Sequence, residues 1–263
     1  MLFVWYKVSF DEKWSHDSAV CETVYFFVEF VCVFPWKCVS LNNQNRGKIM
    51  DGILRKLPIG IQTFEKLREG DYLYVDKTAL VWRIASTETP YFLSRPRRFG
   101  KSLLLSTFEA YFEGKKELFE GLAIADMEKE WKTYPVFHLD LNAEKYDSPQ
   151  ALVEILSRQL TQWELKYGKG EDEETLSGRF AGVIRRACEQ SGRGVVVLVD
   201  EYDKPLLQAL GDDALLDDYR KTLKAFYGVL KSSDRYLRFV FLTGVTKFAQ
   251  VSVFSDLNQL ISV

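Results

Sequence analysis

The sequence YFLSRPRRFGKSLLLST, residues 91–107, decides the fold. Its centre, Gly100-Lys101-Ser102, matches the end of the Walker A pattern G-x-x-x-x-G-K-[ST]. In that pattern backbone N–H groups surround phosphates, the lysine reaches the β and γ phosphates, and the hydroxyl binds Mg²⁺. The first position of the pattern holds Arg95 in place of glycine. A bare G-K-S triplet is common by chance, so the surrounding residues have to decide its meaning.

The residues on either side favour a phosphate-binding turn. Tyr91–Leu93 is a short apolar run typical of a buried strand, and after Ser102 apolar side chains recur at helical spacing, at Leu104, Phe108, Tyr111 and Phe112. The turn is therefore expected at a helix N-terminus, where unpaired N–H groups and the helix dipole favour an anion. An ordinary basic turn before a helix is the alternative. The predicted nucleotide-binding residues are Arg95, Pro96, Arg97, Arg98, Phe99, Gly100, Lys101, Ser102 and Leu103.

A second polar site follows another buried strand. Val195–Val199 is a continuous aliphatic run, as in a parallel strand covered on both faces, and Asp200-Glu201 comes directly after it. This is the Walker B pattern, in which Asp200 holds Mg²⁺ together with Ser102, and Glu201 activates the attacking water. The same pattern also occurs at plain strand ends. Its position two strand–helix units after G-K-S favours the Walker B interpretation.

A third polar residue ends the next strand. Arg238–Leu242 reads as a buried strand, and Thr243 follows it. In P-loop ATPases with an additional strand, a polar residue at this point senses the γ phosphate or positions water. Thr243 therefore joins Lys101 and Glu201 as a predicted catalytic residue. A threonine that only caps the following turn is an equally open interpretation.

The remaining pattern alternates strands and helices. Helices are expected near 64–67, 77–84, 148–168, 176–192 and 216–230, and a strand over 135–141. Such alternation predicts an α/β fold with a mostly parallel sheet between helices. Asp76 is placed to cap the second helix. The segment 72–78 either borders the nucleotide base or packs in the core, and His138 is given no role.

Composition narrows the class of protein. The chain has 263 residues, 47% of them hydrophobic and 27% charged, with a net charge of −2. These values are typical of a globular domain and argue against a basic protein that coats nucleic acid. The four cysteines, Cys21, Cys32, Cys38 and Cys188, have no C-x-x-C spacing, so neither a zinc site nor a disulfide framework is indicated. We predict a cytoplasmic protein.

The first 49 residues differ from the rest of the chain. They hold three of the cysteines and the apolar run AVCETVYFFVEFVCVFPW, which Glu22 and Glu29 interrupt. A membrane or signal segment is the weaker interpretation, because the start is not basic and no A-x-A site follows. We expect an atypical, mis-called or disordered extension over 1–49 and an AAA-like ATPase domain over 50–263. That domain is expected to stop before the fifth strand and helical lid of such proteins.

Four segments together resemble the AAA-ATPase-like family of gut and anaerobic bacteria: YLYVDKTALV, YFLSRPRRFGKSLLLSTFEAYFEGKKELFEGL, VVVLVDEYDKPL and FVFLTGVTKF. The resemblance runs from about Leu57 to Leu260, and RPRRFGKS and DEYDKPL are unusual forms of their motifs. Arginine at the first Walker A position is normal in that family, so the resemblance makes Arg95 an identifying feature. It also implies an α/β fold of the additional-strand (ASCE, AAA-like) P-loop NTPase class, with ATP and Mg²⁺ as ligands. Members usually continue into a PD-(D/E)XK nuclease-like domain, from which this sequence departs.

The leading functional prediction is Mg²⁺-dependent ATP hydrolysis coupled to an unspecified process. The alternative is a catalytically weak or inactive nucleotide-dependent regulatory module that works through a protein partner. A further hypothesis is nucleic-acid binding through the basic cluster Arg95, Arg97 and Arg98, suggested by the nuclease neighbour of the family. The sequence does not predict an oligomeric state.

Overall fold

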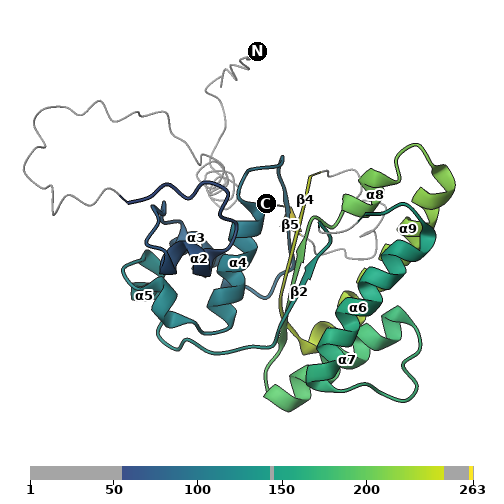
Figure 1. Cartoon of the computed structure of the whole chain (residues 1–263). Coiled ribbons are helices and arrows are strands. Elements are labelled where there is room, and N and C mark those ends of the chain that lie inside the picture. The colour runs from purple at the N-terminus through teal and green to yellow at the C-terminus, as the bar shows by residue number, and fades with distance from the viewer. Residues whose placement is uncertain (1–54, 143–144, 246–260, 263) are drawn as a thin grey trace, which may run out of the picture.

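The computed structural model describes residues 55–142, 145–245 and 261–262. Its centre is a five-stranded, entirely parallel sheet with the strand order β2-β3-β4-β1-β5 (Figure 1). The strands are β1 (Tyr91–Ser94), β2 (Val136–Asp140), β3 (Val195–Asp200), β4 (Leu237–Gly244) and β5 (Ile261–Ser262). In this order β4 lies between β1 and β3, although it follows both of them in the chain.

Helices cover both faces of the sheet, which gives three layers (Figure 1). On one face lie α2 (Phe64–Glu69), α3 (Thr78–Ala85), α4 (Lys101–Phe112), the 3₁₀ helix η1 (Lys116–Phe119) and α5 (Ala123–Met127). On the other lie α6 (Pro149–Tyr167), α7 (Leu176–Ser191), α8 (Lys204–Gln208) and α9 (Asp213–Ser232), and a 3₁₀ turn, η2 (Asp234–Tyr236), leads into β4. The predicted α/β architecture is confirmed.

The strands are apolar along their whole length because both faces are covered. In β3, Val196 and Leu198 belong to the core beneath α4, whereas Val195, Val197 and Val199 belong to the core beneath α6, α7 and α9. Successive strand side chains point to opposite faces, so a continuous apolar run fills both cores at once. The predicted strand over 195–199 is thus explained by its place in the middle of the sheet.

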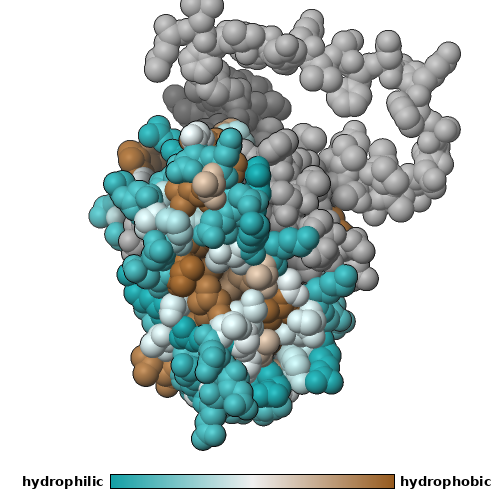
Figure 2. All heavy atoms as spheres, turned by 90° about the vertical axis from the view of Figure 1, so that its right-hand side faces the viewer, coloured by the Kyte–Doolittle hydropathy of each residue, from teal (hydrophilic) through white to brown (hydrophobic). Residues whose placement is uncertain are grey.

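The outer helical layer is amphipathic, as its spacing predicts. Phe180 of α7 and Phe226 of α9 stack with ring centroids 4.4 Å apart, and both are buried. Figure 2 views this side of the molecule, where the surface is largely hydrophilic around a smaller apolar area. The exposed large apolar side chains on α6 are Val153 and Leu165.

One sequence expectation is corrected by the fold. The sheet does have a fifth strand, since β5 pairs with β1 through Tyr91 and Ile261, so the prediction that the chain stops before it is wrong. Ser148 occupies the N-cap position of α6, but its side chain makes no capping bond; its carbonyl instead accepts from the hydroxyl of Tyr219 at 2.7 Å. The predicted extension over 1–49 lies outside the described residues.

Candidate active site

Parallel register brings the predicted polar residues to one edge of the sheet. Leu93 pairs with Thr243 across β1 and β4, and Val199 pairs with Leu242 across β3 and β4. Because all strands run the same way, the ends of β1, β3 and β4 meet at the carboxyl edge. The turn after β1 and the Asp200-Glu201 pair therefore lie on either side of Thr243.

The turn after β1 leaves a row of backbone donors unpaired. Arg98 and Gly100 have φ angles of 70° and 75°, in the left-handed region, and Lys101 is the first residue of α4. Within the described chain, no hydrogen bond is formed by the backbone N–H groups of residues 97–103. The first N–H groups of any helix lack an intrahelical partner, and here the preceding turn adds more donors at the same place. Such a cradle suits an anion.

Lys101 is buried and folds back over this turn. Its side chain is 3% exposed, and its Nζ donates to the carbonyls of Arg95 at 2.9 Å and Pro96 at 3.3 Å. The same Nζ forms an ion pair with Glu201 Oε1 at 3.0 Å. The structure thus brings together one predicted phosphate ligand and the predicted catalytic base.

Glu201 has a strained backbone. Its φ is 53°, in the left-handed region that few residues other than glycine adopt, and its side chain is 12% exposed. The backbone N–H of Glu201 donates to Thr243 Oγ1 at 3.3 Å, and the N–H of Tyr202 donates to the Thr243 carbonyl at 2.9 Å. These bonds to β4 hold the turn and aim the carboxylate at Lys101.

Thr243 also contacts Asp200. Its Oγ1 donates to Asp200 Oδ1 at 2.5 Å, and both residues are buried. The hydroxyl therefore links β4 to both residues of the Asp200-Glu201 pair. Asp200 Oδ2 makes no protein hydrogen bond in the described part of the chain.

The residues present fit a magnesium ion bound jointly with a phosphate. Ser102 is half-buried in the first turn of α4, and Asp200 offers one unpaired carboxylate oxygen. Mg²⁺ is usually held by one or two protein oxygens plus waters and substrate phosphates, not by a full protein cage. In keeping with that, the described residues contain no group of three or more His, Cys, Asp or Glu side chains arranged to hold a metal alone.

The other residues of the predicted nucleotide set are exposed or structural. Residues 96–100 are exposed, with Phe99 at 43%, whereas Leu103 is half-buried and Arg95 donates from Nη1 to the Ser94 carbonyl at 2.8 Å. Burial lowers the pKa of Arg95 below its usual value. The basic cluster is therefore split, with Arg97 and Arg98 facing outward and Arg95 turned toward β1.

Asp203, which sequence reasoning missed, fixes the shape of the site. It is fully buried, and both of its carboxylate oxygens accept from the N–H of Val245, at 3.0 and 3.2 Å. Gly244 lets this happen: a Cβ there would lie 2.4 Å from the ring of Tyr202. The available signal was the second aspartate of DEYDKPL. A carboxylate so close to the Walker B pair is stable in a buried position only if it accepts hydrogen bonds, which predicts a role in holding the site.

The segment 72–78 has structural contacts in the described chain. Tyr74 packs edge-on against Phe64, with ring centroids 5.4 Å apart. Asp76 accepts from the N–H of Thr78 at 2.8 Å, which caps α3 as predicted, and from the N–H of Ala123 at 2.7 Å. The contact of Tyr74 supports the core interpretation for this aromatic residue, whereas Asp76 is exposed and holds the start of α3.

Fold and site together define a parallel α/β protein with a lysine-bearing anion cradle facing two acidic residues. The model of the family described as predicted AAA-ATPase matches residues 58–254. The chain belongs to this family, which confirms the resemblance drawn from the sequence and indicates a nucleotide-binding protein.

Among curated proteins, the chain is similar to one described as an uncharacterized protein in the vnfD 5′ region of Azotobacter chroococcum mcd 1. The two are 44% identical over 207 residues, which is 78% of this chain and 40% of the relative. The chain thus spans less than half of that protein. No solved structure matches. None of the helices in the described residues is long and apolar enough to cross a membrane.

Proposed function

We propose that this chain binds Mg-ATP at the turn after β1 and hydrolyses it. The observation that carries the proposal is the meeting of Lys101 and Glu201, whose charged atoms lie 3.0 Å apart although their strands are separated by β4. The insertion of β4 between β1 and β3 supports the additional-strand class of P-loop NTPase. In that class the polar tips of three adjacent strands share one site.

Each residue has a role that follows from its position. The N–H groups of residues 97–103 surround the phosphates, and Lys101 exchanges Glu201 for the β and γ phosphate oxygens. Ser102 and Asp200 hold Mg²⁺, which when bound offsets the charge of the phosphates. Glu201, released from Lys101, orients the attacking water. Thr243 keeps Asp200 in one orientation through its 2.5 Å hydrogen bond and anchors the backbone of Glu201.

A nucleotide-dependent switch without rapid turnover is the second candidate. It is favoured by the same ion pair, because a base that is paired with Lys101 does not activate water until the pair opens. In this case ATP binding would rearrange the turn after β3 and alter contacts with a protein partner. Nucleic-acid binding through Arg95, Arg97 and Arg98 stays a prediction, with only Arg97 and Arg98 exposed.

Binding and turnover are tested on the whole chain with three proteins. Fluorescent ATP is titrated, and phosphate release is followed, for the native chain, for Lys101→Ala and for the exposed control Lys169→Ala. We expect Lys101→Ala to abolish nucleotide binding and Lys169→Ala to leave it unchanged. Equal affinity of the native chain and Lys101→Ala would refute the proposed site. Binding without phosphate release would favour the switch.

A further inference from the structure

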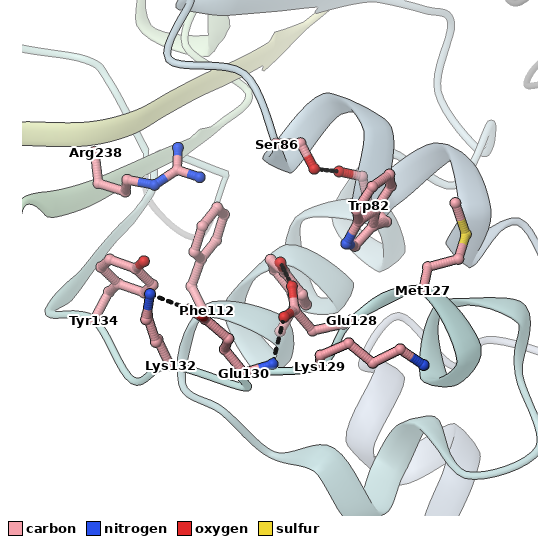
Figure 3. Close-up of a pocket in the computed structure, with 11 residues that line it drawn as sticks. Trp82, Ser86, Phe112, Met127, Glu128, Lys129, Glu130, Lys132, Tyr134 and Arg238 are labelled. Atoms are coloured by element: carbon pink, nitrogen blue, oxygen red, sulfur yellow. Dashed lines mark hydrogen bonds and ion pairs between the residues drawn. The ribbon is translucent and has the colours of Figure 1, made fainter.

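A cavity lies at the end of the sheet opposite the turn after β1. It has a volume of about 360 Å³, and Figure 3 shows its lining residues: Trp82, Ser86, Tyr111, Phe112, Met127, Glu128, Lys129, Glu130, Lys132, Tyr134 and Arg238. Phe112 is the last residue of α4 and Lys101 the first, so the cavity and the nucleotide site are about 16 Å apart along that helix. Arg238 and Thr243 likewise lie near opposite ends of β4. The cavity is not part of the site already described.

Four aromatic side chains line the cavity beside five charged ones. Trp82 comes from α3, Phe112 from α4, and Tyr134 from the segment that precedes β2. In Figure 3, Tyr134 and Arg238 lie on one side, and Trp82 faces them across the opening. A volume of this size is within the range of small-molecule sites, and flat side chains from three elements suit a flat apolar group.

One rim of the cavity is a loop held in an unusual conformation. The carboxylate of Glu128 accepts from the hydroxyl of Tyr111 at 2.5 Å and from the N–H of Glu130 at 2.8 Å. Although burial alone would raise it, the pKa of Glu128 is lowered by these hydrogen bonds, so the carboxylate stays ionised and the loop stays ordered. Trp131, next in the loop, has a φ of 42°. An aromatic residue in this region is held there by its surroundings, here the rings of Tyr111 and Phe119.

The charges around the cavity favour an anion. Three cationic and two acidic side chains line it. Both acids are engaged within the protein, Glu128 as above and Glu130 by Lys132. Lys129 and Arg238 have no carboxylate partner in the described chain: Lys129 donates to the Asp126 carbonyl at 2.6 Å. The lining therefore carries one more positive than negative charge, with Glu128 as the carboxylate that no cation pairs in the described chain.

Arg238 is positioned to receive an acidic group. Its two terminal nitrogens donate to the carbonyls of Thr87 at 3.0 Å and Ala85 at 2.8 Å, at the end of α3. These bonds use two of the five guanidinium donors. Its charged group also lies 5.8 Å from the ring centroids of Phe112 and Tyr134. The guanidinium is thus fixed in orientation, beside an aromatic wall, with donors to spare.

We propose that this cavity is a second ligand site, which binds a small aromatic carboxylate. The ring of the ligand lies between Trp82 and Tyr134, and its carboxylate lies between Arg238 and Lys129. The site is independent of the nucleotide-binding turn and of whether ATP is hydrolysed.

The test uses a set of probes that share a ring and differ in charge: naphthaleneacetate, its neutral amide, and naphthylmethylamine. Binding to the full chain is measured by calorimetry. We expect the acid to bind, the amide to bind about tenfold more weakly and the amine not to bind, since only the acid places a negative charge against Arg238 and Lys129. Equal binding of acid and amine would overturn the proposal.

Variants locate the bound probe. Lys129→Ala is expected to weaken naphthaleneacetate at least about fivefold, and Trp82→Leu by a similar factor, because each removes one half of the recognition. The exposed control Lys169→Ala should bind as the native chain does. Arg238→Gln should abolish binding, with circular dichroism reporting whether α3 stays docked. Unchanged affinity in both Lys129→Ala and Trp82→Leu would refute the site.

A competition experiment separates this proposal from the nucleotide site. Naphthaleneacetate should bind equally well to the native chain and to Lys101→Ala, and saturating Mg-ATP should not displace it. Displacement by Mg-ATP, or loss of the probe in Lys101→Ala, would place the probe at the turn after β1 and overturn the proposal. Neither outcome depends on ATP turnover.

Discussion

Replacing Glu201 by glutamine tests whether the ion pair between Lys101 and Glu201 competes with phosphate for Lys101. Lys101 Nζ lies 3.0 Å from Glu201 Oε1, and the two side chains are only 3% and 12% exposed. Any phosphate that takes Lys101 must first displace that carboxylate. Glu201→Gln keeps the size of the side chain and a hydrogen-bond acceptor but removes the competing charge.

The size of the effect follows from the distance. At an effective dielectric constant of about 20, unit charges 3.0 Å apart attract by roughly 5 kcal/mol. When Glu201 moves outward, hydration of its carboxylate offsets much of this lost attraction. The remaining difference is about 1.5–3 kcal/mol, the usual contribution of a hydrogen bond to a charged group. We therefore expect Glu201→Gln to bind ATP about 10- to 100-fold more tightly than the native chain. Hydrolysis should be lost, because the amide does not activate water.

The assay pairs equilibrium titration of fluorescent ATP with single-turnover phosphate release. Glu171 is exposed in the turn after α6. The variant Glu171→Gln therefore controls for the change in net charge and should bind ATP as the native chain does. Unchanged or weaker ATP affinity in Glu201→Gln would show that the ion pair does not compete with phosphate. Full turnover in that variant would remove Glu201 from the chemistry.

Other substitutions test separate contacts. Thr243→Val removes the donor to Asp200, so phosphate release should slow about tenfold or more; a native rate would contradict the positioning role. Burial opposes the charged form of His138, but the hydrogen bond that its Nδ1 donates to Glu109 Oε2 at 2.9 Å prevails and raises the pKa of His138. The pair therefore stabilises the fold fully below about pH 6.5, and its contribution is lost as the pH rises through the raised pKa. His138→Asn should flatten that slope in urea unfolding, and an unaltered slope would exclude the pair. Phe180→Ala should lower the free energy of unfolding by about 3–5 kcal/mol in the same assay, and a loss below about 1 kcal/mol would show that the core refills.

Elements with a long, clear period were predictable from the sequence. The pattern expected over 148–168 and 176–192 matches α6 and α7 closely, because each buries one continuous apolar stripe. The short helices α5 and α8 were missed. At five residues each they complete little more than one turn, too few positions for a period to register.

The site was predictable as a set of residues but not as an arrangement. Motif spacing selected Lys101, Asp200, Glu201 and Thr243, and parallel register does bring them to one edge. Which side chain bonds which depends on approaches of about 3 Å across β4, and no local pattern encodes those. The sequence left open whether Thr243 caps a turn, and it did not predict the contact of its hydroxyl with Asp200.

The strand order has a consequence for how this protein matures. Because β4 separates β1 from β3, and β4 comes after both in the chain, the cradle and the acidic pair stay apart until the late strand inserts between them. Parallel pairing of distant segments is slow, because the entropy of closing the loop is lost before the strand contacts that offset it have formed. Nucleotide would then recognise only molecules whose sheet is complete and would stabilise those by mass action. If the chain binds ATP as proposed, the nucleotide would therefore raise the fraction of fully folded molecules, in addition to any role as a substrate.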